Sequence, residues 1–355
     1  MNLQSKHYNF AILASHSYDS YLDWIKAIEE SDKDLNYSII FLDSSNWLDQ
    51  IQSGNFDMVL ISPPFMTIKT KNMCDERLFV ISQLLNIPVY PDFKSFMVYE
   101  NKRLLDYILD IYEIPRPETW NFHNKQEALE FTGNCPYPIV AKIITGSAGI
   151  GVRFLRNKQQ AQQYIKTAFS KGVRSVTGPG IRRGGLIKRF IAGFHKVGYF
   201  KKLLTNYKSI FYERQVGYVF LQECINHTYE WRCVRIDDSY FFHKKVVKGR
   251  MASGSLIKEY GAPPQSLMDF VRFVSDKIGV YSAAFDIFET LEKGYLVNEV
   301  QAFFGQSDPY QMVIDGIPGR YLYNKEQWIF EPGDFNRNKS YNLRLNHVFK
   351  MLSHP

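Results

Sequence analysis

Apolar residues follow two different periods in the first hundred positions of the chain. Short runs of four to seven mostly apolar residues are typical of strands, and the stretches between them place apolar residues at helical spacing. The strand-like runs are residues 8–14, 37–42, 56–62 and 87–90, and the first helical stretch is 18–30. Strands that alternate with helices predict a parallel sheet, so we expect an α/β domain over residues 1–97.

The pattern changes after a helix predicted at 101–112, which Pro115 and Pro117 end. Residues 98–216 then give strand 137–144, a glycine-rich loop, strand 152–155 and a helix from 157 to 169. From residue 217 to the end, apolar runs of sheet type dominate and predict an α+β segment with antiparallel strands. These runs are 218–224, 230–236, 240–247, 283–288 and 294–300, with one helix at 267–278. We therefore expect three segments, 1–97, 98–216 and 217–355.

Composition makes this a globular chain, because 45% of its 355 residues are apolar and 15% are aromatic. Its apolar runs are far shorter than the roughly 20 residues that a membrane span needs. No apolar block follows Lys6 and His7, so we expect a cytoplasmic protein without a membrane span. The four cysteines are scattered, which argues against a disulfide framework or a structural zinc site.

The net charge of +7 is concentrated in one part of the chain. Residues 166–214 contain twelve lysines and arginines and the single acid Glu213, a net charge of +11, while the rest of the chain is −4. This basic insert is either a solvated arm or a docking surface for an anionic partner, such as an acidic glycan or a phosphorylated carrier. It has no zinc or RNA-recognition motif, so we expect no nucleic acid partner.

The hairpin predicted at 283–299 places two carboxylates together. If its turn is centred between Glu292 and Lys293, Asp286 and Glu299 face each other. Carboxylates about 5 Å apart repel unless a positive charge lies between them, and Mg²⁺ is a suitable cation. A different register, a shared proton or a lysine partner are the alternatives.

A second group of candidate residues lies around the glycine-rich loop. Small residues let backbone N–H groups approach phosphate oxygens, and Lys142 on the preceding strand adds a positive charge. The loop residues are Gly146, Ser147, Ala148, Gly149 and Gly151. The loop lacks the ending of a Walker motif, so a flexible hairpin turn is the alternative.

A third group follows the strand at 218–224. Gln222 and Glu223 end this strand, and Glu230 opens the next one. Carboxylates suit ribose hydroxyls because they accept two hydrogen bonds, so the group is compatible with one edge of a nucleotide site. Ordinary polarity at a strand end is the alternative.

The order of these groups along residues 98–310 resembles the ATP-grasp superfamily, and the preceding α/β unit resembles its Rossmann-like N-terminal domain. The resemblance implies an ATP-dependent ligase that activates a carboxylate as an acyl phosphate and joins it to an amine, with ATP and Mg²⁺ as cofactors. It implies that Lys102, Lys142 and the glycine loop contact the nucleotide phosphates. Adenine would lie beside Glu223, Cys224 and Ile225, with Gln222 adjacent, and the ribose would lie beside Glu230.

The resemblance also implies roles in catalysis and metal binding. Arg232 and a basic residue of 244–250, of which Arg250 is our candidate, would face the transferred phosphoryl group. Asp286 and Glu299 would hold magnesium with Gln301, which stands where the family usually has asparagine.

Two branches of the superfamily resemble this chain: ribosomal-protein glutamate ligases, and ATP-grasp proteins of polysaccharide-assembly gene sets. The sequence leaves the carboxylate open between a small molecule, a peptide and an acidic glycan, and a homodimer is a candidate assembly. The substitution at Gln301 supports one rival hypothesis, a nucleotide-binding regulator or scaffold without turnover.

Overall fold

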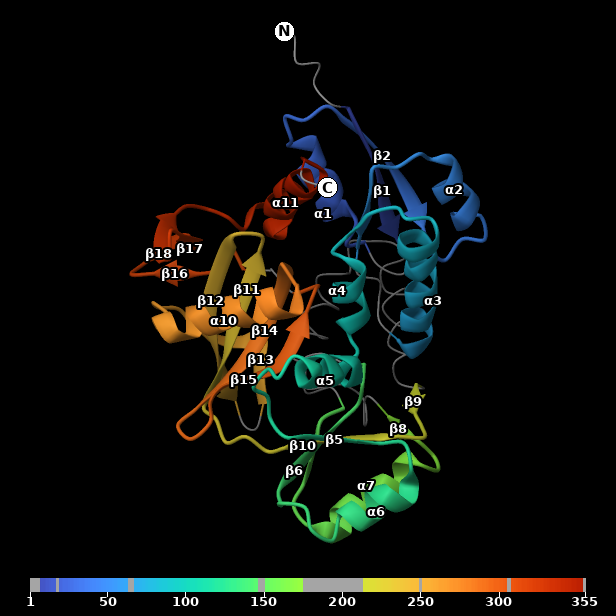
Figure 1. Ribbon diagram of the computed structural model, residues 1–355, viewed down its shortest axis with the longest axis vertical. Helices are drawn as coiled ribbons and strands as arrows, with labels where there is room; N and C mark the ends of the chain where they lie inside the picture. The colour runs from blue at the N-terminus through green and yellow to red at the C-terminus, as the bar shows by residue number, and fades with distance from the viewer. Residues whose placement is uncertain are drawn as a thin grey trace, which may run out of the picture. The chain divides into compact units, whose positions relative to one another are not determined.

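The computed structural model describes residues 7–16, 19–62, 67–145, 151–174, 213–248, 251–304 and 308–353. It divides into two compact units, and Figure 1 shows the elements of each. Unit 1 comprises residues 1–64, 71–116 and 227–355, and unit 2 comprises residues 65–70 and 117–226. These two units do not share the boundaries of the three segments expected from the sequence, so the division into three domains stays a prediction.

Unit 1 contains the predicted parallel sheet. Its strand order is β2-β1-β3-β4, and every neighbouring pair is parallel. The strands are β1 (Tyr8–Ala14), β2 (Leu35–Phe41), β3 (Met58–Ile61) and β4 (Val89–Tyr90). Strands β1 and β3 are almost completely buried, which explains their continuous apolar sequence. The helices of this half are α1 (Leu22–Glu29), α2 (Trp47–Ser53), α3 (Ile68–Phe79), α4 (Phe93–Val98) and α5 (Lys102–Ile111), and a π-helix follows α3 at Val80–Leu84.

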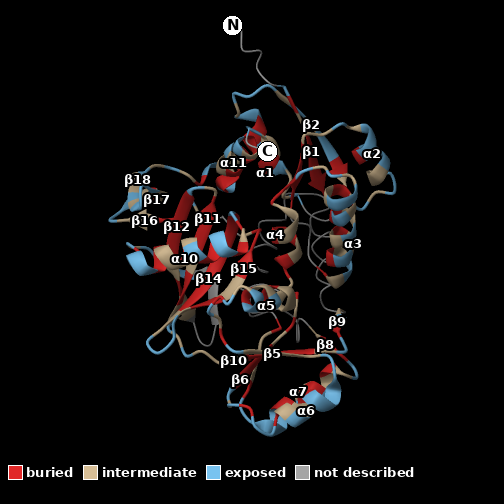
Figure 2. Cartoon of the chain, in the orientation of Figure 1, coloured by how far each residue is buried: buried red, intermediate tan, exposed pale blue. Residues whose placement is uncertain are grey.

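Unit 1 also contains an eight-stranded sheet, in which β13 and β18 join the path β15-β14-β11-β12-β17-β16. Its central strands are β11 (Tyr229–Ile236), β12 (Ser239–Lys248), β14 (Ser282–Thr290) and β15 (Gly294–Gln301). The outer strands are β13 (Met251–Glu259), β16 (Val313–Ile314), β17 (Ile317–Asn324) and β18 (Gln327–Pro332). Helix α10 (Gln265–Ile278) lies across one face of the sheet, and Figure 2 shows the buried residues beneath it. The opposite face is therefore the one that polar side chains can occupy.

The C-terminal segment completes unit 1. A short 3₁₀ turn (Arg337–Ser340) leads into helix α11 (Tyr341–Ser353), which packs against α1 and contacts β11. The sequence pattern did not predict α11 or strands β16–β18. None of the described helices is long and apolar enough to span a membrane.

Unit 2 is the smaller unit and combines antiparallel sheets with two helices. Its four-stranded sheet has the order β5-β10-β6-β7, all pairs antiparallel, and β8 pairs with β9. The apolar sides of helices α6 and α7 pack with this sheet in one core. The elements are β5 (Thr119–Phe122), α6 (Lys125–Phe131), β6 (Ile139–Lys142), β7 (Arg153–Leu155), α7 (Lys158–Ala168), β8 (Val173–Arg174), β9 (Arg214–Gln215) and β10 (Val219–Glu223).

Candidate functional site

The predicted carboxylate pair is present in unit 1. Asp286 of β14 and Glu299 of β15 are direct partners in the antiparallel register. They reach this pairing by a route that the sequence did not reveal. Between the turn and Ile287, each residue of β14 pairs one position away from the partner that we predicted. Ile287, for example, pairs with Val297. A β-bulge then adds one residue, Asn298, to β15 and restores the expected register. Our turn position was therefore wrong, and the direct pairing of Asp286 with Glu299 is confirmed.

Lysine and arginine side chains surround the two carboxylates. Lys102 Nζ, at the first residue of α5, lies 2.9 Å from Glu299 Oε1. Arg232 of β11 and Lys245 of β12 both pair with Asp286 at 2.7 Å, and Lys245 is also 2.7 Å from Glu230 Oε2. The lysine partner that the sequence left open as an alternative therefore exists, in a form that balances each buried carboxylate.

The pKa values of this cluster follow from burial and charge. Burial opposes ionisation of Glu230, but the Lys245 ammonium and His227 together outweigh it and lower the Glu230 pKa to about 2. Burial likewise opposes the charged form of Lys245, whereas Asp286 and Glu230 raise its pKa. The same balance holds at Lys102, where Glu299 raises the pKa against burial. Glu230, Lys245 and Lys102 are therefore charged at neutral pH.

Two oxygens of this cluster are suited to a metal ion. Asp286 Oδ1 and Gln301 Oε1 are buried and have no hydrogen-bond donor among the described residues. Arg232 Nε is close to Asp286 Oδ1, but its direction does not make a hydrogen bond. Gln301 instead donates from Nε2 to Glu299 Oε1 at 2.8 Å. Two carboxylates and an amide oxygen on one sheet face fit Mg²⁺, which takes few protein ligands and keeps water or phosphate oxygens.

The described residues hold no group of three or more His, Cys, Asp or Glu that could bind a metal by themselves. Mg²⁺ does not require one, because nucleotide phosphates complete its shell. These residues do not form the closed four-ligand site that is typical of structural zinc.

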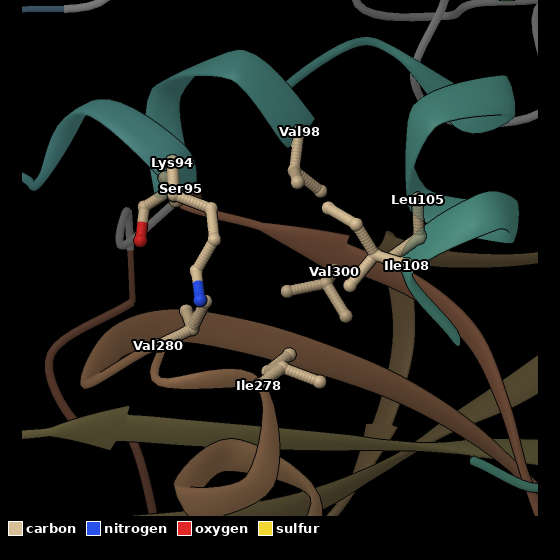
Figure 3. A pocket seen from close by; sticks show the side chains of 9 residues that line it. Lys94, Ser95, Val98, Leu105, Ile108, Ile278, Val280 and Val300 are labelled. Carbon is tan, nitrogen blue, oxygen red and sulfur yellow. The ribbon is translucent and has the colours of Figure 1, made fainter. Parts of the chain in front are cut away.

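The strand that carries Glu299 and Gln301 is supported from its other face. Val300 and Ala302 alternate with them and line a small apolar cavity of about 10 Å³ with Val98, Leu105 and Ile108 (Figure 3). The cavity is no larger than about one water molecule, so the apolar side chains pack closely around it. Packing on this side therefore fixes the strand, while the metal-facing side remains polar.

His243 of β12 is a member of the polar face that the sequence did not single out. It lies opposite Arg232, and its Nδ1 is 3.1 Å from the carbonyl oxygen of Gln311. A carbonyl only accepts, so Nδ1 carries the proton in the neutral ring. Burial, with the nearby charges of Lys258 and Arg232, lowers the His243 pKa to about 3.

This shift predicts a loss of stability in mild acid. The unfolded chain takes up the His243 proton near pH 6.5, whereas the folded chain does so only near pH 3. The stability that comes from the neutral, buried His243 is therefore fully present above pH 6.5. It declines as pH falls below 6.5, by about 2 kcal/mol between pH 6.5 and 5. Urea unfolding of wild type and His243→Leu at pH 7 and pH 5 measures it: the variant should lose less stability, and equal losses would contradict the prediction.

The other predicted nucleotide residues lie in unit 2. Lys142 ends β6 and Gln222 is buried in the adjacent β10, where it donates to Thr119 Oγ1 at 3.1 Å. The Glu223 carboxylate accepts from the Glu118 amide at 3.2 Å, and Cys224 and Ile225 follow it at intermediate exposure. Their roles toward ATP stay predictions.

The glycine loop is described only at Gly151. This residue has a φ of +74°, and a Cβ there would come within 2.2 Å of the Ile143 side chain, so glycine is required. Gly146, Ser147, Ala148, Gly149 and Arg250 lie outside the described residues, as do positions 175–212 of the basic insert.

Comparison with known proteins supports the fold. The family model described as carbamoyl-phosphate synthase L chain, ATP binding domain, matches residues 103–200. The chain is 24% identical over 285 residues to the alpha-aminoadipate–LysW ligase LysX of Saccharolobus solfataricus, covering 78% of this chain and 86% of that protein. Both similarities support the ATP-grasp superfamily that the order of motifs indicated.

Solved structures agree at the level of fold. D-alanyl-alanine synthetase A from Vibrio cholerae aligns over 98% of this chain and 99% of its own, with a TM-score of 0.56 and 11% identity. N5-carboxyaminoimidazole ribonucleotide synthetase in complex with ADP aligns over 84% and 71%, with a TM-score of 0.51 and 12% identity. The fold class predicted from the sequence is thus confirmed.

Proposed function

We propose that this chain is an ATP-dependent ligase that joins a carboxylate to an amine. The observation that carries the proposal is the facing pair Asp286 and Glu299 with three cations beside it: Arg232 and Lys245 on the same sheet face, and Lys102 at the start of α5. The similarity to LysX, named as a ligase of alpha-aminoadipate and LysW, supports the reaction class.

In the proposed reaction, a carboxylate oxygen of the substrate attacks the γ-phosphorus of ATP, and ADP leaves. The amine then attacks the carbonyl carbon of the acyl phosphate, phosphate leaves, and the amine's proton passes to solvent. Asp286, Glu299 and Gln301 would hold magnesium, which supplies Lewis-acid stabilisation of the phosphoryl oxygens when bound.

The chain's own residues provide the remaining electrostatics. Arg232 and Lys245 are fixed by their carboxylate partners, so they present positive charge to the transferred group without reorganisation. Lys102, Lys142 and the glycine loop would orient the phosphates, and Glu230 and Gln222 to Ile225 the nucleoside. No nucleophilic side chain is needed, because catalysis of this type is positioning and charge stabilisation.

The substrate is proposed at the level of class. Similarity to LysX, which is named as a ligase of alpha-aminoadipate, favours a substrate pair that includes an amino acid, and a peptide carboxylate is the first class to test. An acidic glycan that uses the basic insert 166–214 is the second class to test, because that insert carries a net charge of +11.

The test of this function traps the acyl phosphate. Purified protein with Mg-ATP, a panel of peptide and glycan carboxylates, and hydroxylamine should give a hydroxamate and ADP with the true carboxylate. Calorimetric titration of ATP with and without Mg²⁺ accompanies it. Magnesium-dependent ATP binding without ADP release for any carboxylate would favour a non-catalytic regulator, and failure of ATP to bind would refute the proposal.

A further inference from the structure

Arg344 on α11 is a fully buried arginine that lacks a counterion. Its side chain is 1% exposed, and no ion pair to it occurs among the described residues. A buried cation without a partner is unfavourable, since burial removes its hydration and nothing replaces it. The position therefore requires an explanation beyond packing.

The unpaired atoms of Arg344 form one geometric unit. Nε and Nη2 are both buried, and neither has a hydrogen-bond partner in the described part of the chain. These two nitrogens donate in parallel from one edge of the guanidinium, which is the fork that binds two oxygens of a carboxylate or phosphate. A planar pair of oxygens matches this edge of the guanidinium.

Aromatic rings hold this guanidinium in place. The Phe304 ring lies 4.5 Å and the Tyr341 ring 5.2 Å from the Arg344 Cζ atom. Ring faces stabilise the cation but accept no N–H fork, so they orient Arg344 without satisfying it. Phe304 is the half-buried ring of the two and follows β15, the strand that carries Glu299 and Gln301.

The surroundings of Arg344 lie at the carboxyl edge of the parallel sheet. The Arg344 charge acts on the Tyr90 phenol, which lies at the end of β4. Trp24 packs against both Tyr90 and Tyr341. Its indole donates to the Ile61 carbonyl at the end of β3. The next residue, Ser62, has a buried hydroxyl with no partner among the described residues. Open α/β sheets bind ligands at this edge.

We propose that the Nε and Nη2 edge of Arg344 binds a carboxylate of a small-molecule ligand. Assigning that carboxylate to the ligation substrate, as a group that is recognised but not activated, rests on the proposed function. The anion site itself does not. A substrate with a second carboxylate, such as a dicarboxylate or an amino acid, fits both requirements.

The test uses the full chain and three salts at equal ionic strength: sodium glutarate, sodium phosphate and sodium chloride. Glutarate should raise the thermal midpoint of the wild type by several degrees relative to chloride. Arg344→Met keeps the volume but removes the fork and should show no glutarate effect. Arg344→Lys keeps the charge and should weaken glutarate binding at least ~tenfold, because a single ammonium cannot bind both oxygens in parallel.

Lys350→Met on the same helix is the matched control, because Lys350 is exposed and its loss removes the same charge. It should respond to glutarate like the wild type. Stabilisation of the wild type by phosphate but not glutarate would overturn the carboxylate assignment, and no anion effect, or an undiminished one in Arg344→Lys, would overturn the site. Mg-ATP titration of Arg344→Met should match the wild type, which separates this result from failure of the nucleotide site.

Discussion

Asp286→Asn and Glu299→Gln are each expected to reduce magnesium-dependent ATP turnover by about 10²–10³-fold. Each substitution keeps the shape of the side chain and removes one of the two facing carboxylates. Magnesium then loses a charged ligand, while the neighbouring cations stay in place. Steady-state release of ADP with the carboxylate found by hydroxamate trapping measures the effect.

The matched control is Glu292→Gln in the exposed turn of the same hairpin. It removes one negative charge from the same element but lies away from the polar face, so turnover should stay within about twofold of the wild type. The metal assignment would be wrong if Glu292→Gln and Glu299→Gln lost turnover equally. It would also be wrong if Glu299→Gln bound Mg-ATP as well as the wild type.

Gln301→Asn tests the one departure from the usual family motif. Asparagine is one methylene shorter, and the present side chain leaves Oε1 without a donor while Nε2 contacts Glu299. This variant tests whether Gln301 is a metal ligand that fits this strand or a substitution that weakens the metal site. Lower Mg-dependent affinity for ATP than in the wild type would show that the strand is built for glutamine.

The candidate site shows what the sequence could and could not predict. Periodicity identified the central strands of both sheets in unit 1, because buried strands have long apolar runs. The pairing of Asp286 with Glu299 was predicted correctly only because the error in the turn position and the bulge at Asn298 cancel. The bulge itself was not predictable, since an extra residue on a strand has no distinct polar or apolar signature.

Lys245 could have been found from the sequence. Ile236 pairs with Ser239 across the two-residue turn Asp237–Asp238, and counting outward from this turn places Glu230 opposite Lys245. An acid facing a lysine within an apolar strand pair is a recognisable signal. His243 and Arg344 gave no comparable signal, because their surroundings come from segments distant in the sequence, at Gln311 and at Phe304.

Lys245→Met is expected to lower the free energy of unfolding by about 3 kcal/mol. The Lys245 ammonium is almost completely buried and is the shared partner of Glu230 and Asp286. Its removal leaves Glu230 as a buried charge whose remaining ion-pair partner among the described residues is His227, at 3.5 Å. Urea unfolding at pH 7 measures the loss, and the double variant with Glu230→Gln should recover most of it, because the uncompensated charge is then gone.

Lys244→Met supplies the matched control for this experiment. Lys244 is the adjacent residue on the other face of β12, where its ammonium lies 4.2 Å from the Tyr229 ring centre, and its loss should change stability by no more than about 1 kcal/mol. Magnesium provides a second readout. Lys245 neutralises Asp286 through Oδ2, so its loss leaves the carboxylate with less compensating charge, and millimolar Mg²⁺ should stabilise Lys245→Met more than the wild type. Equal magnesium effects in both proteins would show that Asp286 does not bind the metal, whatever the lysine contributes to folding.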